Sequence, residues 1–211
     1  MKRALVAIFG LMTLSSPAFA YFDVMDTGEV MASGRYKLTP EVQFITDGGG
    51  ANIGTNFDLG LSEDMGLRFQ IGAGDTNFSL AGFFKYMPFP DTDSQPAIGF
   101  NLGVVYAHDA GDADFTVRWE PLVSKKFGFD WGGLTPYASI PLGINHRGSS
   151  RYNHDHNNLT VQAAVGSQVD LKTLPDVGLM AEVGFDLNKA NSYVTFGAAW
   201  SFGAENSKGH D

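Results

Sequence analysis

The sequence predicts an all-β protein, and more specifically a closed, antiparallel, up-and-down transmembrane β-barrel of about ten strands. Short segments with an apolar residue at every second position follow one another along most of the chain, which is the period of a strand with two different faces. The face opposite the apolar one carries mainly Gly, Ala, Ser, Thr, Asn and Gln. Beyond residue 20, no stretch approaches the roughly 18 consecutive apolar residues of a membrane-spanning helix.

Residues 1–20 have the pattern of a cleaved secretory signal peptide. Lys2 and Arg3 precede a short apolar run, and Ala18 and Ala20 complete a small-x-small cleavage motif. The apolar run is too short for a transmembrane helix, so we expect export and removal of this segment.

The rest of the chain divides into three parts. Residues 21–33 show no clear period, and we interpret them as a lead segment that can reach the barrel mouth. Residues 34–202 are expected to form the barrel, and residues 203–211 a polar tail.

Five alternating runs occupy the first half of the predicted barrel: residues 35–44, 52–61, 66–72, 78–86 and 98–107. Each has a regularly spaced apolar face that includes, in order, Phe44, Ile53, Phe69, Leu80 and Phe100. Segments rich in Gly, Asp, Ser or Pro separate these runs, as expected for the turns between antiparallel strands.

Five further runs complete the barrel: residues 115–124, 134–145, 159–170, 177–186 and 191–202. Their apolar faces include Val117, Ile144, Val165, Val183 and Phe196. The prolines that fall within or beside the first, sixth and seventh runs are Pro40, Pro121, Pro136 and Pro141. Each proline removes a ladder donor, so we expect an irregular register there. Eight or twelve strands remain alternatives to ten.

A soluble β-sandwich could have the same alternation, but the two faces favour a barrel. The apolar faces together carry roughly 45 apolar side chains, many of them aromatic, which is more than the interior of a ten-stranded barrel can hold. A sandwich could bury them, but its outer faces would then carry the usual Lys and Glu. The apolar face is therefore predicted to face lipid, and the small polar face to line the lumen.

The last run ends in a pattern with a known counterpart. A polar residue, a glycine two positions on and two alternating aromatic residues stand at Thr195, Gly197, Trp200 and Phe202. This pattern resembles the C-terminal assembly signal of Gram-negative outer-membrane β-barrels. The resemblance covers about a dozen residues.

The resemblance implies a location in the cell outer membrane, with outer-membrane lipid, the barrel-assembly machinery and periplasmic chaperones as partners. It also implies that an even-stranded barrel has both termini in the periplasm, which makes residues 21–33 a periplasmic lead segment. The net charge of −9 argues against nucleic acid as a partner. No cofactor is expected, and with no Cys there is no disulfide.

The inward face is predicted to carry charges of both signs: Arg35, Lys37, Glu41, Asp58, Arg68, Lys85, Arg118, Glu120, Asp170, Glu182 and Asp186. Ion pairs that close and rigidify the interior are one interpretation, because buried charges persist when they are paired. A constricted, water-filled pore with opposing charges is the other. The interleaved signs leave both open.

We therefore expect a structural protein or a narrow passive pore. The alternative is a surface-active barrel, a rim enzyme or an adhesin, that works through the outer loop 146–157. In that loop His154 and His156 are candidates for a metal site, but no third ligand is specified, so we expect solvated residues and no metal. Enzymatic activity is not expected, because the loop offers residue types without a catalytic motif.

Overall fold

The computed structural model describes residues 23–75, 78–109, 112–149 and 156–203. The strands are β1 (Arg35–Ile45), β2 (Ala51–Gly60), β3 (Met65–Gly74), β4 (Phe78–Phe89), β5 (Ala97–Asp109), β6 (Asp112–Ser124), β7 (Phe127–Phe129), β8 (Gly132–Ser139), β9 (Leu142–Ser149), β10 (His156–Leu171), β11 (Leu174–Asn188) and β12 (Tyr193–Gly203). Among these residues there is no helix with the length and hydrophobicity to cross a membrane.

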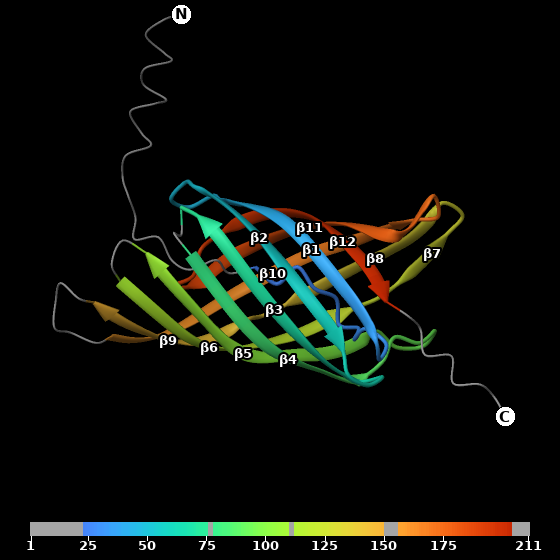
Figure 1. The fold of residues 1–211 in the computed structure, drawn as a ribbon, viewed down its shortest axis with the longest axis horizontal. Helices are drawn as coiled ribbons and strands as arrows, with labels where there is room; N and C mark the ends of the chain where they lie inside the picture. Colours follow the sequence, from blue (N-terminus) through green and yellow to red (C-terminus); the bar gives the residue numbers. More distant parts are fainter. Residues whose placement is uncertain (1–22, 76–77, 110–111, 150–155, 204–211) are drawn as a thin grey trace, which may run out of the picture.

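The strands form a closed, tilted ring (Figure 1). Consecutive strands pair antiparallel from β1 to β6, and β12 returns to pair with β1 from Arg35↔Gly203 to Ile45↔Tyr193. β8 and β9 share the place between β6 and β10, each filling one half of it. The short β7 pairs only with the start of β8. The wall therefore has ten places, and the predicted closed, antiparallel, up-and-down barrel is confirmed.

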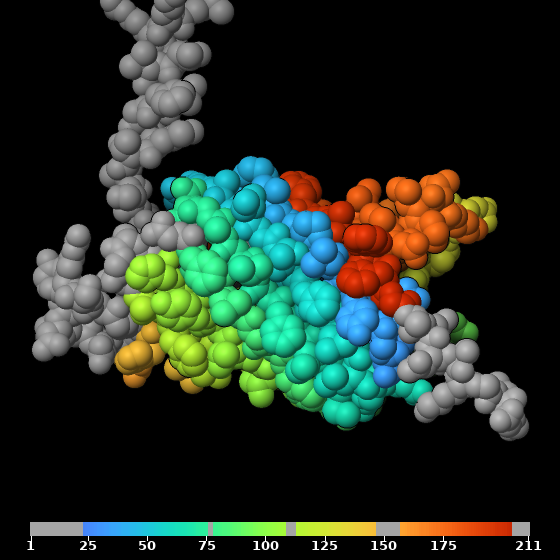
Figure 2. Space-filling model, viewed as in Figure 1, coloured from blue at the N-terminus to red at the C-terminus, as the bar shows by residue number. Residues whose placement is uncertain are grey.

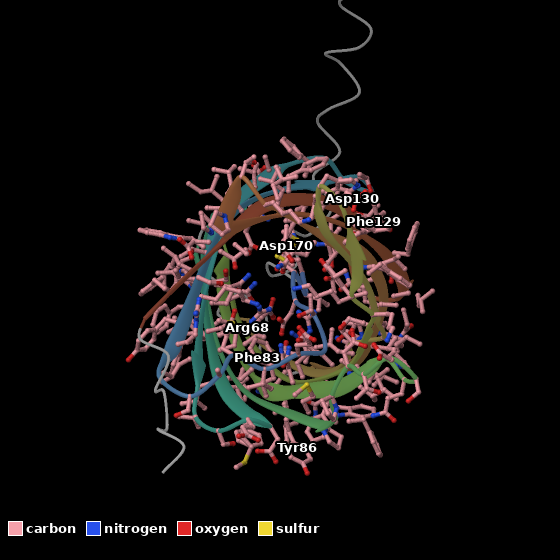
Figure 3. All side chains as sticks on the ribbon, turned by 90° about the vertical axis from the view of Figure 1, so that its right-hand side faces the viewer. Arg68, Phe83, Tyr86, Phe129, Asp130 and Asp170 are labelled. Atoms are coloured by element: carbon pink, nitrogen blue, oxygen red, sulfur yellow. The ribbon has the colours of Figure 1, made fainter. Side chains whose placement is uncertain are left out.

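Side chains alternate between the two faces of the wall, as the sequence indicates. In β4, Phe83 and Lys85 are buried inside, whereas Leu80 and Phe84 are 49% and 39% exposed on the outside. Viewed end-on, Arg68 lies within the ring and Tyr86 outside it (Figure 3). The outward side chains of β1 to β5 pack into a dense outer surface (Figure 2). Apolar residues thus cover the barrel, and polar residues fill it.

Pro40, Pro121 and Pro141 coincide with interruptions of the ladder, whereas Pro136 stays in regular register with Ser167, contrary to the expected irregularity. The β1–β12 pairing skips Thr39 and Pro40. β6 changes partner from β9 to β8 across Glu120 and Pro121, which face the break at Ile140 and Pro141. The seventh predicted run is consequently two strands rather than one, because a proline cannot donate to the ladder.

A groove of about 280 Å³ lies on the outer face beside the break between β8 and β9. Its lining includes Ile98, Pro121, Val123, Ala138 and Ile140. The wall is thus locally indented on its apolar side where the hydrogen-bonded ladder is interrupted.

Inward glycines make room for the large side chains of the lumen, which predicts a specific cost for filling them. A Cβ at Gly184 would lie 2.2 Å from the Tyr193 ring, whereas one at Gly82 on the outer face would meet only Phe69, at 3.9 Å. We expect Gly184→Ala to lower the free energy of unfolding in detergent by about 1–3 kcal/mol, because the ring must move. Gly82→Ala should raise it by up to about 1 kcal/mol, since glycine is unfavourable within a strand. Equal effects in urea titrations would contradict this packing.

Candidate functional site

The lumen contains the N-terminal part of the described chain. Asp23, Val24, Met25 and Asp26 are each at most 2% exposed, and Thr27 is 7% exposed. In the end-on view this segment runs inside the ring (Figure 3). Residues 21–33 were expected to form a periplasmic lead segment that can reach the barrel mouth, but residues 23–31 lie deeper, buried or half-buried within the barrel. The physical reason is charge: the inward face provides cations, and the segment brings a carboxylate.

Asp26 is the centre of this contact. Its Oδ1 lies 3.3 Å from Lys37 Nζ and 3.2 Å from Arg68 Nη2, and its Oδ2 lies 2.8 Å from Lys85 Nζ. The Asn101 side-chain amide also donates to Oδ2, at 3.3 Å. Both carboxylate oxygens of a fully buried Asp26 thus meet donors from the wall.

The same cations hold other atoms as well. Arg68 binds Asp58 through two nitrogens, at 2.7 and 3.0 Å, and also donates to the Val24 and Met25 carbonyl oxygens. Lys85 donates to the Thr27 carbonyl at 2.7 Å. The segment is therefore bound through its backbone as well as through the charge of Asp26.

Glu182 of β11 provides a second anchor. Its two carboxylate oxygens accept the backbone N–H groups of Val24 and Met25, at 2.8 and 2.7 Å. The hydroxyl groups of Tyr137 and Tyr193 donate to the same carboxylate. Four donors around one buried carboxylate compensate its loss of water.

Glycines of the wall allow the segment to approach closely. A Cβ at Gly60 would lie 2.1 Å from the Met31 carbonyl oxygen, and one at Gly197 would lie 2.8 Å from the Met25 methyl group. A Cβ at Gly99 would lie 2.9 Å from the Gly28 carbonyl oxygen. The Gly28 N–H in turn donates to the Ser124 hydroxyl at 2.9 Å. The wall is shaped to the segment along its path.

The predicted lumen charges divide into two groups. The buried ones are Lys37, Glu41, Asp58, Arg68, Lys85, Arg118, Glu120 and Glu182. Arg35 and Asp170 are half-buried, and Asp186 is exposed, where it accepts the Ala190 N–H at 2.9 Å. Asp170 lies 3.7 Å from Lys126 near one end of the barrel. The three charges that are not buried, Arg35, Asp170 and Asp186, thus lie close to strand ends.

One small cavity lies beside the paired charges. Arg118 is bound to Glu120 at 2.8 Å, and Arg118, Thr160 and Gln162 help to line a cavity of about 10 Å³. This volume is about that needed for one water molecule. This cavity is too small for a substrate.

The remaining predicted residues lie elsewhere. Thr195 is fully buried, while Trp200 and Phe202 are 53% and 37% exposed on the outer face of β12. His154 lies outside the described residues, and of His156 only the backbone, paired with Arg147, is described. Among the side chains that the structure does describe, no three His, Cys, Asp or Glu residues are grouped as metal ligands.

Comparisons with known proteins add a likeness of shape. No family model and no curated protein matches the chain. A de novo designed transmembrane β-barrel is 16% identical, with 82% of this chain and 99% of that chain covered and a TM-score of 0.41. The N-terminal β-barrel domain of Pseudomonas aeruginosa OprF is 13% identical, with 82% and 100% covered and a TM-score of 0.36. The translocator domain of the autotransporter NalP from Neisseria meningitidis is 9% identical, with 95% and 94% covered and a TM-score of 0.47. At these values the likeness assigns no function.

Proposed function

We propose that this protein is an outer-membrane β-barrel with a structural role, kept closed by its own N-terminal segment and non-conducting at rest. The observation that carries the proposal is the contact of the buried Asp26 carboxylate with Lys37, Arg68 and Lys85. It favours the structural role over the narrow passive pore, because these cations are bound to the chain itself and not free to line a water path.

The outer surface supports placement in a membrane. Outward residues such as Ile53, Leu102, Ile144 and Val165 are 64%, 48%, 62% and 55% exposed. Water would make so extensive an apolar surface unfavourable, whereas lipid matches it. A closed barrel also satisfies the backbone groups of its wall without water.

The proposed location in the outer membrane and the proposed assembly partners depend on the sequence of the last strand. Thr195, Gly197, Trp200 and Phe202 resemble the assembly signal of outer-membrane barrels, which implies periplasmic chaperones and the barrel-assembly machinery as partners and periplasmic termini. β12 closes the ring against β1, with Phe202 stacked on Tyr36 at a ring distance of 5.6 Å.

The first test is conductance in planar lipid bilayers. The wild-type barrel should give no current steps, because its lumen is occupied. Asp26→Asn keeps the size of the side chain but removes its charge, so intermittent steps are expected as the segment leaves. Asp91→Asn is the matched control: it removes a carboxylate that binds Lys125 at 2.7 Å outside the lumen, and it should stay silent. Steady conductance of the wild type would contradict closure.

The second test concerns the apolar surface. Leu102→Arg in the middle of β5 should lower the free energy of unfolding in lipid vesicles by about 2–4 kcal/mol, because the charge enters hydrocarbon. Trp131→Arg, at an outward position beyond β7, should cost only about 0–1 kcal/mol, as expected near the interface. A protein that remains monodisperse in buffer without detergent would disprove membrane placement.

The third test separates stability from recognition in β12. Trp200→Ala with Phe202→Ala should still fold into detergent, since lipid-facing truncations cost less than the about 3–5 kcal/mol of a protein core. The same variant should fail to accumulate in the outer membrane of cells, because its assembly signal is lost. Gly203 is the last residue of β12 and pairs with Arg35, so deleting only residues 204–211 should be harmless. Equal losses in cells and in refolding, or a severe effect of the deletion, would argue against recognition.

A further inference from the structure

The donors around Asp26 come from the wall and surround a carboxylate from two sides. Lys37 and Arg68 approach Oδ1, at 3.3 and 3.2 Å, while Lys85 and Asn101 approach Oδ2, at 2.8 and 3.3 Å. We propose that these four side chains form a carboxylate-binding site in the lumen, which Asp26 occupies as a tethered ligand. The inference rests on the proposed closure for its role, but the site can be tested separately.

The site is built into rigid structure. Its four residues belong to β1, β3, β4 and β5, and all four residues are at most 5% exposed. These strands are joined by continuous ladders, such as Lys37↔Asp58 to β2 and Lys85↔Asn101 between β4 and β5. Because the wall holds the donors, their arrangement does not depend on the segment that they bind.

The charge balance requires an anion at this place. Lys37, Arg68 and Lys85 contribute three positive charges, and Asp58 contributes the only carboxylate of the wall within ion-pair distance of them among the described residues. Without Asp26, buried positive charge remains uncompensated, which is strongly unfavourable. A carboxylate group compensates the excess positive charge, whichever molecule carries that group.

Asp26 compensates this positive charge as a ligand and not as part of the wall. Residues 23–33 belong to no strand, and they contact the barrel through side chains and single backbone groups. A tethered group acts at an effective concentration of about millimolar or more. A simple free carboxylate therefore competes poorly in the wild type, and the site becomes accessible to it when the Asp26 side chain is removed.

The experiment is rescue of Asp26→Gly by sodium formate, which supplies a carboxylate and fits the space left by the side chain. Thermal unfolding of the full chain in detergent is followed by circular dichroism. We expect Tm roughly 10 °C below the wild type, because buried cations lose their partner. Formate should raise Tm along a saturable curve, and at 100 times its Kd it should lower the unfolding equilibrium constant about 100-fold.

Two matched controls make the result specific. Sodium chloride at equal ionic strength should leave Tm of Asp26→Gly low, since chloride lacks two planar oxygens. Asp26→Asn fills the space with a neutral amide except when the segment leaves, so its lowered Tm should respond to formate much less than that of Asp26→Gly. If Asp26→Gly does not fold, refolding yield with and without formate is the readout, and formate should restore it.

The site is disproved by an Asp26→Gly variant as stable as the wild type, by equal rescue with chloride and formate, or by a refolding yield that formate leaves unchanged. An equal formate response of Asp26→Asn would also disprove it. Conductance of the wild type does not enter this result: a conducting wild type with formate rescue would overturn the closure and leave the carboxylate site standing.

Discussion

The rest of the interior depends on one constraint, which is that a buried charge needs a partner. A barrel with an apolar exterior directs its polar residues inward, where water is scarce and unpaired charges are unfavourable. Around Lys37, Arg68 and Lys85 the wall offers Asp58, and the N-terminal segment offers Asp26. The path of the segment through the lumen therefore follows from the charge on the inward face.

The wall was predictable because its signal is local. Alternation with period two assigns each side chain to a face without any knowledge of its partner, and the ten runs correspond to the ten places in the wall. Strand ends were harder to predict from the sequence. β10 (His156–Leu171) and β11 (Leu174–Asn188) are longer than their apolar runs, because they continue to pair with each other beyond them. From the sequence, the break between β8 and β9 at Pro141 could be predicted only as an irregular register. A proline lacks the backbone N–H donor, but this does not reveal which strand changes partner.

The segment inside the barrel could not be predicted in the same way. It lies in no sheet and so has no period, and its anchors are distant in sequence: Val24 and Glu182 are separated by 158 positions. The glycines that make room for it, Gly60 and Gly197, look like ordinary strand glycines until the segment is in place. Among the predicted lumen charges, Asp186 lies near a strand end, where an inward register position no longer implies burial.

The two anchors of the segment differ in what they demand of its sequence. Glu182 belongs to the wall and accepts backbone N–H groups, which nearly any residue at positions 24 and 25 would provide. Lys85 and Arg68 also donate to backbone carbonyl oxygens of the segment, and these contacts do not depend on which side chain the segment carries. At position 26 the wall cations require a carboxylate, which has no hydrogen of its own to donate. The Asp23 carboxylate is also held by its side chain, since it accepts from the Gln70 amide at 2.8 Å. The backbone contacts can therefore hold many sequences in the lumen, whereas the carboxylates of Asp23 and Asp26 add a requirement for particular side chains.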